Sequence, residues 1–234
     1  MHGTNIIRKQ ELRDDGTLQI HEIFPTIQGE GPLAGTPAVF VRLTGCNLRC
    51  TFCDTEWNDS TDRYMLFEDV FHRILLLRGE IDLVVLTGGE PMRQNIVPLI
   101  RMLNDHEIKV QIETAGTVWL DRLPQPNNMF SIVCSPKTPV VNDSIIGWCN
   151  DWKYIVRAGE VSLEDGLPIM STQTQGKDQQ LFRPPCGSNI YVQPCDEGPG
   201  NESATKANTA EAVRSAMRFG YRLSLQQHKI IGVP

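Results

Sequence analysis

The chain has 234 residues, of which 40% are hydrophobic and 21% are charged. This length suits one compact domain that buries about 70% of the surface exposed by its unfolded chain. The 22 Lys and Arg residues and the 28 Asp and Glu residues give a formal net charge of −6. That balance argues against a broad binding surface for nucleic acid or for anionic membranes, whereas a small anionic ligand needs only local positive charge.

The composition also bounds the cellular setting. No apolar run approaches the roughly 18 residues of a membrane span, and the N-terminal sequence MHGTNIIRKQELRDDG lacks the apolar stretch of a secretory signal. We therefore expect a soluble, cytoplasmic chain without a membrane partner. Seven cysteines, an odd number in a chain without an export signal, favour metal or redox chemistry over a disulfide scaffold.

Short β-branched apolar runs alternate with stretches of helical periodicity, which is typical of βαβ units and a largely parallel sheet. In chain order, we expect strands at Leu18–Phe24, Ala38–Leu43, Leu83–Leu86, Lys109–Ile112, Phe130–Cys134, Lys153–Val156 and Ile190–Val192. The spacing of apolar residues predicts helices at Leu66–Leu77, Ile96–Leu103 and Ala204–Phe219. The expected fold class is α/β.

Residues 157–188 interrupt this alternation. They are rich in Gly, Pro, Ser, Thr and Gln and show no periodicity. We interpret the stretch as a loop insertion at about 157–188 in a single domain that spans residues 1–234. The tail QQHKIIGVP is assigned no helix or strand.

One loop carries three cysteines. Directly after the expected strand AVFVRL, the sequence TGCNLRCTFCDT places Cys46, Cys50 and Cys53 with the spacing C-x3-C-x2-C. A closed zinc site needs four ligands, and no fourth Cys or His lies close by in the sequence. An iron-sulfur cube needs one ligand for each of four irons, so three cysteines leave one iron open. A zinc loop completed by a distant residue, or three unligated thiols, is the alternative.

The cysteine triplet resembles the signature of the radical S-adenosylmethionine (SAM) enzymes, in which the amino and carboxylate groups of SAM chelate the open iron. Phe52 matches the aromatic residue that lies near the adenine in that superfamily. The later stretch LVVLTGGEP resembles the superfamily's GGE motif, in which Glu90 would hold the methionine amino group. Taken alone, LVVLTGGEP is typical of an ordinary strand-to-helix turn, whose glycines let main chain approach a ligand.

Two further expected strand ends carry polar side chains. VQIETAGT places Glu113 and Thr114 after one strand, and SIVCSPK places Ser135, Pro136 and Lys137 after another. Open α/β sheets and barrels usually build their sites at such ends. Lys137 would offset a carboxylate and Glu113 would hold a ribose or an ammonium, although a solvated loop charge is the commoner case.

Read together, FPTIQGEGPLAGTPAVFVRLTGCNLRCTFCDTEW, TGGEP, ETAGT, SPK, YVQPCD and the last proline resemble the 7-carboxy-7-deazaguanine synthase family. The resemblance extends from about Glu22 to Pro234. It implies a partial (incomplete) TIM-like barrel of the radical SAM type. It also implies a carbon–nitrogen lyase that converts 6-carboxy-5,6,7,8-tetrahydropterin into 7-carboxy-7-deazaguanine, with loss of ammonia, in queuosine-type 7-deazapurine biosynthesis.

The resemblance assigns residues one by one. It implies one 4Fe-4S cluster, held by Cys46, Cys50 and Cys53 together with SAM, and a Mg2+ ion at Thr55. The SAM contacts that it implies are Phe52, Gly89, Glu90, Glu113, Ser135, Pro136, Lys137, Gln193, Pro194, Cys195 and Asp196. The substrate contacts that it implies are Ile27, Gln28, Gly29, Arg42, Thr87 and Pro234, in which Arg42 offers a guanidinium fork and Pro234 a carboxylate.

The resemblance further implies an electron donor such as flavodoxin or ferredoxin and a homodimer, and neither nucleic acid nor a membrane is expected as a partner. Two features depart from the family pattern: the stretch 157–188, and Cys195 at a position where an apolar residue is usual. Cys134, Cys149, Cys186 and Cys195 lack clustered ligand spacing, so we expect buried reduced thiols. The alternative functions are a glycyl-radical-enzyme activating enzyme and a non-catalytic zinc-binding module.

Overall fold

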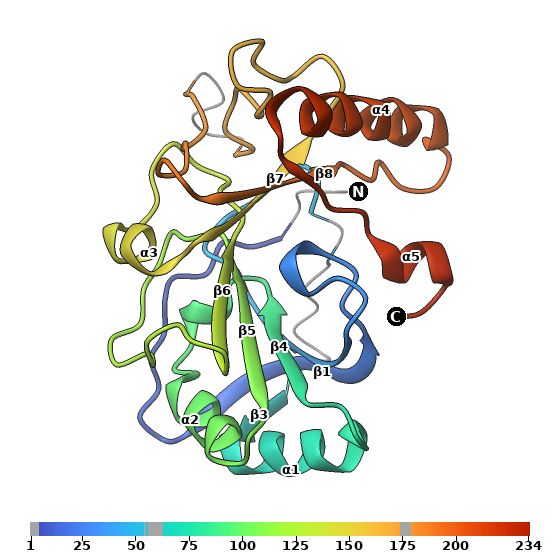
Figure 1. Cartoon of the computed structure of the whole chain (residues 1–234). Coiled ribbons are helices and arrows are strands. Elements are labelled where there is room, and N and C mark those ends of the chain that lie inside the picture. The colour runs from blue at the N-terminus through green and yellow to red at the C-terminus, as the bar shows by residue number, and fades with distance from the viewer. Residues whose placement is uncertain (1–4, 54, 56–62, 174–178) are drawn as a thin grey trace.

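A computed structural model describes residues 5–53, 55, 63–173 and 179–234. The strands form one nine-stranded sheet in the order β3-β1-β2-β4-β5-β6-β7-β8-β9 (Figure 1). Strand β2 and strands β4 to β9 pair in parallel with their neighbours along this order, whereas β1 pairs antiparallel with both β2 and β3. Since β3 and β9 are the two edges, the sheet is an open, incomplete barrel, as the fold prediction requires.

The strands are β1 (Thr17–Ile27), β2 (Pro37–Leu43), β3 (Arg63–Leu66), β4 (Leu83–Gly88), β5 (Lys109–Thr114), β6 (Phe130–Cys134), β7 (Asp151–Val156), β8 (Asn189–Pro194) and β9 (Arg222–Leu223). The helices are α1 (Phe67–Arg78), α2 (Val97–Asp105), α3 (Asp143–Trp148), α4 (Glu202–Phe219) and α5 (Gln227–Ile231), with 3-10 turns η1 (Gly31–Leu33) and η2 (Pro91–Arg93). In the described part of the chain, no helix is long and apolar enough to cross a membrane.

All seven expected strands and all three expected helices are present, most with bounds a few residues longer than expected. The elements that the sequence did not predict are short: β3, β9, α3 and α5. The first residue expected in helix α1, Leu66, instead ends β3, and its extended backbone (φ −60°, ψ 144°) makes it the residue that caps the start of α1. The tail contains the five-residue helix α5, whose partners lie far away in the sequence.

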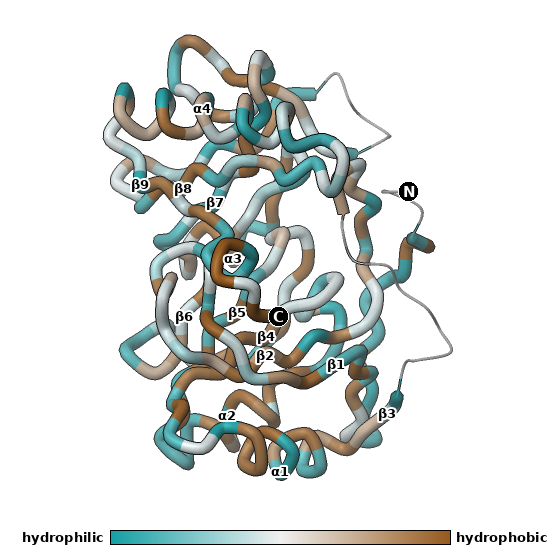
Figure 2. Tube along the Cα trace, turned by 90° about the vertical axis from the view of Figure 1, so that its right-hand side faces the viewer, coloured by the Kyte–Doolittle hydropathy of each residue, from teal (hydrophilic) through white to brown (hydrophobic). Residues whose placement is uncertain are grey.

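The main core lies between the sheet and the helices packed on its outer face. Side chains alternate along β7, so that Trp152, Tyr154 and Val156 face this core. Helix α4 contributes Ala212 and Ala216, whose small side chains let it lie close to the sheet. Hydrophobic residues recur along the strands and on α1 and α2 (Figure 2). Each large apolar side chain that is fully buried stabilises the folded chain by about 1.5–3 kcal/mol relative to the same side chain in water.

The inner face of the sheet is filled differently along its length. Near the amino ends of the strands, Leu33 from η1 packs on a small cluster of Ala38, Leu83 and Val85. Figure 1 places α5 and the C-terminus on the side of the sheet away from α3. The Gln227 main-chain N–H donates to the Gly29 carbonyl (3.1 Å), which joins α5 to the loop before η1. These contacts close the amino end of the barrel and leave its carboxyl end as the place for a site.

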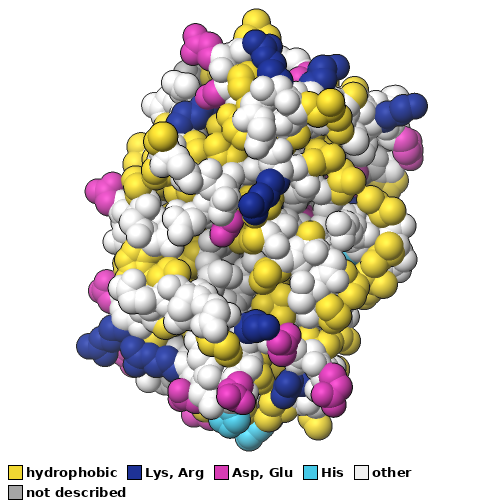
Figure 3. Space-filling model, viewed as in Figure 1, with side chains coloured by type: hydrophobic (Ala, Val, Ile, Leu, Met, Phe, Trp, Pro, Cys, Tyr) yellow, Lys and Arg dark blue, Asp and Glu magenta, His cyan; other side chains and the backbone are white. Residues whose placement is uncertain are grey.

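The outer surface carries charges of both signs, scattered over the face seen in Figure 3, in agreement with the mild net charge. The described residues of 157–188 form turns and isolated bridges, among them Val161 with Pro168 and Met170 with Gln180. The prediction that residues 157–188 form a loop insertion with these bounds stays a prediction.

Candidate active site

A cavity of about 250 Å³ lies at the carboxyl ends of the parallel strands. Because these ends meet at one edge of the sheet, residues distant in sequence converge there. The lining includes residues from β2, β4, β5, β7 and β8 and from the loops that follow β2 and β6. Of the predicted site residues, it contains Arg42, Cys46, Cys50, Phe52, Cys53, Thr55, Thr87, Gly89, Glu113, Ser135, Lys137, Gln193, Pro194, Cys195 and Asp196.

The three cysteines of the loop line this one cavity as reduced thiols. Among the described residues, no group of three or more His, Cys, Asp and Glu side chains is arranged for a single metal ion. A four-iron cube does not need that arrangement, since each cysteine binds a different iron at a separate corner. Burial, with a smaller effect of Glu90, raises the pKa of Cys46 to about 12, so a thiolate there needs a cation beside it. The donor set therefore fits an iron-sulfur cube.

The two glycines after β4 bring main chain against the cysteine loop. Gly88 has a φ of +130°, a conformation that favours glycine. A Cβ on Gly89 would lie 2.1 Å from the Gly45 carbonyl oxygen and 2.9 Å from the Cys46 nitrogen. The Glu90 N–H donates to the Gly45 carbonyl at 3.0 Å. Only glycine at position 89 permits this approach, which fixes the cysteine loop relative to β4.

Glu90 is not among the described residues that line the cavity, and it lies behind the cavity wall. Its side chain is fully buried and accepts hydrogen bonds from the Met92 N–H (3.1 Å), the Thr114 hydroxyl (2.8 Å) and the Ala115 N–H (2.9 Å). Burial raises the pKa of Glu90 to about 7. These bonds tie the GGE turn to the end of β5, and the contact of Glu90 with SAM stays a prediction.

The ring of Phe52 lies near two cations. Lys137 Nζ is 5.9 Å and the Arg157 guanidinium 5.8 Å from the centroid of its ring. Lys137 Nζ also donates to the carbonyl oxygen and to the hydroxyl of Ser135, and burial lowers the pKa of Lys137. Pro136, between them, is outside the described lining. An aromatic face with cations on it suits a ligand that carries negative charge and a flat ring.

Arg42 and Thr55 lie together at the wall near β2. Arg42 Nε donates to a Glu22 carboxylate oxygen at 2.6 Å, and Arg42 Nη1 lies 3.5 Å from the Thr55 hydroxyl. Both residues and Thr87 line the cavity. Asp196 and Lys229 also line the cavity, and Lys229 Nζ lies 2.7 Å from an Asp196 carboxylate oxygen. The C-terminal segment therefore contributes to the site.

Four of the predicted substrate residues lie below or beside the described lining: Ile27, Gln28, Gly29 and Pro234. Gln28 donates to Gln111 Oε1 (2.6 Å) and to Glu113 Oε1 (2.9 Å). A Cβ on Gly29 would lie 2.1 Å from His228 Nδ1, so glycine lets α5 approach. The Thr26 hydroxyl donates to the Pro234 carbonyl oxygen at 2.5 Å. The contacts of these four residues with a substrate stay predictions.

Sequence reasoning missed a buried ion pair at the floor of the cavity. Lys153 on β7 pairs with Glu113 at 2.8 Å and also with Glu30, and all three side chains are less than one-fifth exposed. Burial opposes the charge of Lys153, but Glu113 and Glu30 outweigh it and hold the lysine pKa above its usual range. The available signal was a lysine between Trp152 and Tyr154 in a strand whose other residues are mostly apolar.

The other cysteines lie apart from the loop. Cys134, Cys149 and Cys195 are buried, whereas Cys186 is exposed, against the expectation of a buried thiol there. The exposure follows from its place at a turn in the 157–188 stretch. Cys195 lines the cavity, and its main-chain carbonyl accepts a hydrogen bond from Asn208 at 2.9 Å.

The incomplete barrel and its three-cysteine loop define a radical SAM enzyme, and the family model of the Radical SAM superfamily matches residues 40–139. The 7-carboxy-7-deazaguanine synthase of Rhodospirillum rubrum is 45% identical over 100% of both chains. That of Rickettsia prowazekii is 36% identical and covers 97% of this chain and 93% of its own. The crystal structure of QueE from Escherichia coli, at 25% identity, aligns with a TM-score of 0.66 over 89% of this chain and 93% of that one. The chain belongs to the 7-carboxy-7-deazaguanine synthase family.

Proposed function

We propose that this chain converts 6-carboxy-5,6,7,8-tetrahydropterin into 7-carboxy-7-deazaguanine, with loss of ammonia, at the cavity that Arg42 and the three cysteines share. The observation that carries the proposal is this shared cavity, in a chain that is 45% identical to a named synthase over its full length. The family implies a 4Fe-4S cluster and SAM, an external reductant and a small-molecule substrate.

The cysteines and the GGE turn have different proposed roles at this site. Cys46, Cys50 and Cys53 would each bind one iron, which leaves the fourth to SAM. When bound, the cluster and SAM supply the radical that removes hydrogen from the pterin. The GGE turn, anchored by the buried Glu90, holds the main chain of Gly88 and Gly89 against the cysteine loop, so the cavity wall is set before any ligand binds.

Arg42 is proposed to bind the carboxylate of the pterin, because a guanidinium offers two parallel N–H donors to a carboxylate. Its neighbour Thr55 presents a hydroxyl at 3.5 Å, and this oxygen is proposed as a ligand of a Mg2+ ion that also binds the substrate. On the cavity floor, Lys153 offsets one of the two negative charges of Glu113 and Glu30, so the positive charge for the carboxylate of the substrate is assigned to Arg42.

The proposed SAM contacts are Phe52, Gly89, Glu90, Glu113, the Ser135 to Lys137 stretch and the Gln193 to Asp196 stretch, and the proposed substrate contacts add Ile27, Gln28, Gly29, Thr87 and Pro234. A homodimer and an electron donor such as flavodoxin or ferredoxin belong to the same proposal. The cytoplasmic location stays a prediction from the sequence.

The test is an anaerobic incubation of the reconstituted chain with carboxypterin, SAM, Mg2+ and a strong chemical reductant, followed by mass analysis. We expect 7-carboxy-7-deazaguanine, 5'-deoxyadenosine and methionine to accumulate together. An activating enzyme for a glycyl-radical protein would cleave SAM without making a deazapurine, and that result would contradict the proposal. The Cys50→Ala variant is the control for reaction outside the site.

A further inference from the structure

Every cysteine of the loop has an N–H donor on its sulfur. The Leu48 main-chain N–H lies 3.4 Å from Cys46 Sγ, Gln173 Nε2 lies 3.2 Å from Cys50 Sγ, and Asn5 Nδ2 lies 3.7 Å from Cys53 Sγ. The Leu48 donor belongs to the loop itself. Asn5 and Gln173 come from two segments that are distant in sequence, the N-terminal arm (residues 5–16) and the 157–188 stretch.

The Gln173 amide is oriented by its surroundings. Its Oε1 accepts the Arg49 main-chain N–H at 2.9 Å, so its nitrogen faces the Cys50 sulfur. The segment beside it is held to the cysteine loop by a bridge between Cys50 and Gln173 and by a hydrogen bond from the Thr51 N–H to the Thr172 carbonyl (3.3 Å). The 157–188 stretch thus delivers a side-chain donor to one proposed cluster ligand.

The Asn5 amide is held by the arm on the other side of the loop. Its main-chain carbonyl accepts Arg49 Nε at 2.9 Å, and its Nδ2 also donates to the Thr55 carbonyl at 2.6 Å. The Arg8 N–H donates to the Cys46 carbonyl at 2.8 Å, which lays the arm along the loop.

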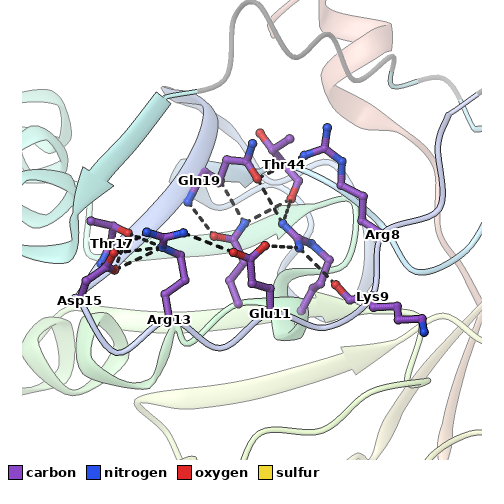
Figure 4. A network of polar contacts seen from close by, with 10 residues as sticks. Arg8, Lys9, Glu11, Arg13, Asp15, Thr17, Gln19 and Thr44 are labelled. Carbon is purple, nitrogen blue, oxygen red and sulfur yellow. Dashed lines mark hydrogen bonds and ion pairs between the residues drawn. The ribbon is translucent and has the colours of Figure 1, made fainter.

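A buried arginine anchors the rest of the arm. Arg93 is 2% exposed and donates to the Lys9 carbonyl (3.2 Å), to the Thr44 carbonyl (3.1 Å) and to Gln19 Oε1 (3.3 Å). Figure 4 shows Lys9, Gln19 and Thr44 gathered around these contacts. The arm is therefore tied to the start of β1 and to the end of β2, and these contacts place Asn5 in addition to the Arg49 residue that it shares with Gln173.

We propose that Asn5 and Gln173 are positioning residues that raise the reduction potential of the cluster through N–H hydrogen bonds to the sulfurs of Cys53 and Cys50. The inference rests on the proposed function, because it requires a cluster on these cysteines. Reduction adds negative charge to the cluster, and donors to its sulfurs stabilise that charge. Removal of either donor therefore makes the cluster harder to reduce.

The experiment is a redox titration of the anaerobically reconstituted cluster, followed by electron paramagnetic resonance. Gln173→Met and Asn5→Leu remove each donor with little change of shape or charge, and Gln173→Glu keeps an oxygen for the Arg49 N–H. At a fixed potential, we expect the ratio of reduced to oxidised cluster to fall about tenfold in each variant, which is ~59 mV for a one-electron couple. Gln180→Met, at an exposed position of the same stretch, is the matched control and should titrate like the wild type.

The midpoint is read from the fraction of assembled cluster that is reduced, so incomplete assembly in a variant does not move it. Midpoints of Gln173→Met and Asn5→Leu equal to that of the wild type would overturn the inference, because a purely structural role predicts no shift. A wild-type chain that assembles no four-iron cluster would instead overturn the proposed function, and the two failures are therefore distinguishable.

Discussion

Lys153 Nζ on β7 lies 2.8 Å from a carboxylate oxygen of Glu113 on β5, across the inner face of the sheet, and the ammonium also pairs with Glu30 from the loop before η1. Strand β6 separates these two strands in the sheet order. The ion pair thus links β5, β7 and the loop before η1, which are not neighbours in the sheet. It lies at the floor of the cavity that the cysteines line.

Replacement of Lys153 by Met should destabilise the chain by about 3–5 kcal/mol, because two buried carboxylates lose their cation. Lys109→Met is the matched control: Lys109 pairs with Asp82 at the same 2.8 Å, but both side chains are about half exposed. We expect Lys109→Met to cost at most about 1 kcal/mol. Urea unfolding measures both, and equal losses would contradict the role assigned to the buried pair.

The same pair predicts a dependence of stability on acid. Burial alone raises the pKa of Glu30, but Lys153 outweighs burial and lowers this pKa from its ordinary value of 4.5 to about 2. A carboxyl with a lowered folded-state pKa contributes stability above its unfolded pKa and loses it as the pH falls toward the folded value. The raised pKa of Lys153 affects stability only at pH values above the ordinary lysine pKa, so it does not contribute to the loss of stability in acid.

We therefore expect the free energy of unfolding to fall more steeply for the wild type than for Glu30→Gln between about pH 5 and about pH 2. Urea titrations at a series of pH values give the two curves. Parallel curves over this range would show that Glu30 has no lowered pKa in the folded chain.

Gly89→Ala should displace the GGE turn from the cysteine loop, since its Cβ would meet the Gly45 carbonyl oxygen at 2.1 Å. We expect a loss of about 1–3 kcal/mol in stability and weaker binding of SAM, measured by calorimetry. Gly147→Ala is the control, because a Cβ there meets no described atom within 4 Å and α3 gains a better helix former, worth about 0.5–1 kcal/mol. Unchanged SAM binding in Gly89→Ala would contradict this account of the turn.

Arg42→Ala should weaken the binding of carboxypterin by about 10–100-fold, the range for loss of a charge-assisted bidentate contact. SAM cleavage should continue slowly and without deazapurine formation. Arg73→Ala, at an exposed position on α1, should leave both quantities unchanged. Substrate affinity that is equal in Arg42→Ala and in the wild type would remove Arg42 from the proposed substrate site.

The parts that sequence predicted well depend on local patterns. The cysteine loop is readable because its three ligands lie within eight residues, and the α/β order is readable because β-branched runs and helical spacing alternate. The pairing of Lys153 with Glu30 and Glu113 was missed because it joins residues up to 123 positions apart. For the same reason, the contact of Gly29 with His228 was not foreseen, since no local pattern marks it.

Glu90 shows a second kind of limit. The GGE motif predicts a contact of Glu90 with SAM, which stays a prediction, but it did not reveal that the carboxylate lies fully buried and accepts hydrogen bonds from Met92, Thr114 and Ala115. Sequence reveals which residues share a turn but not which way a side chain points, because that is decided by packing from the neighbouring strand.

The most direct test of the three-cysteine site is the metal content of the anaerobically reconstituted chain. We expect about four iron and about four sulfide ions per wild-type chain, with a resonance signal of the reduced cluster that changes when SAM binds to the open iron. Cys50→Ala should lose the cluster, whereas Cys186→Ala, at an exposed position, should retain it. Stoichiometric zinc, or a wild-type chain that never assembles a four-iron cluster, would contradict the account.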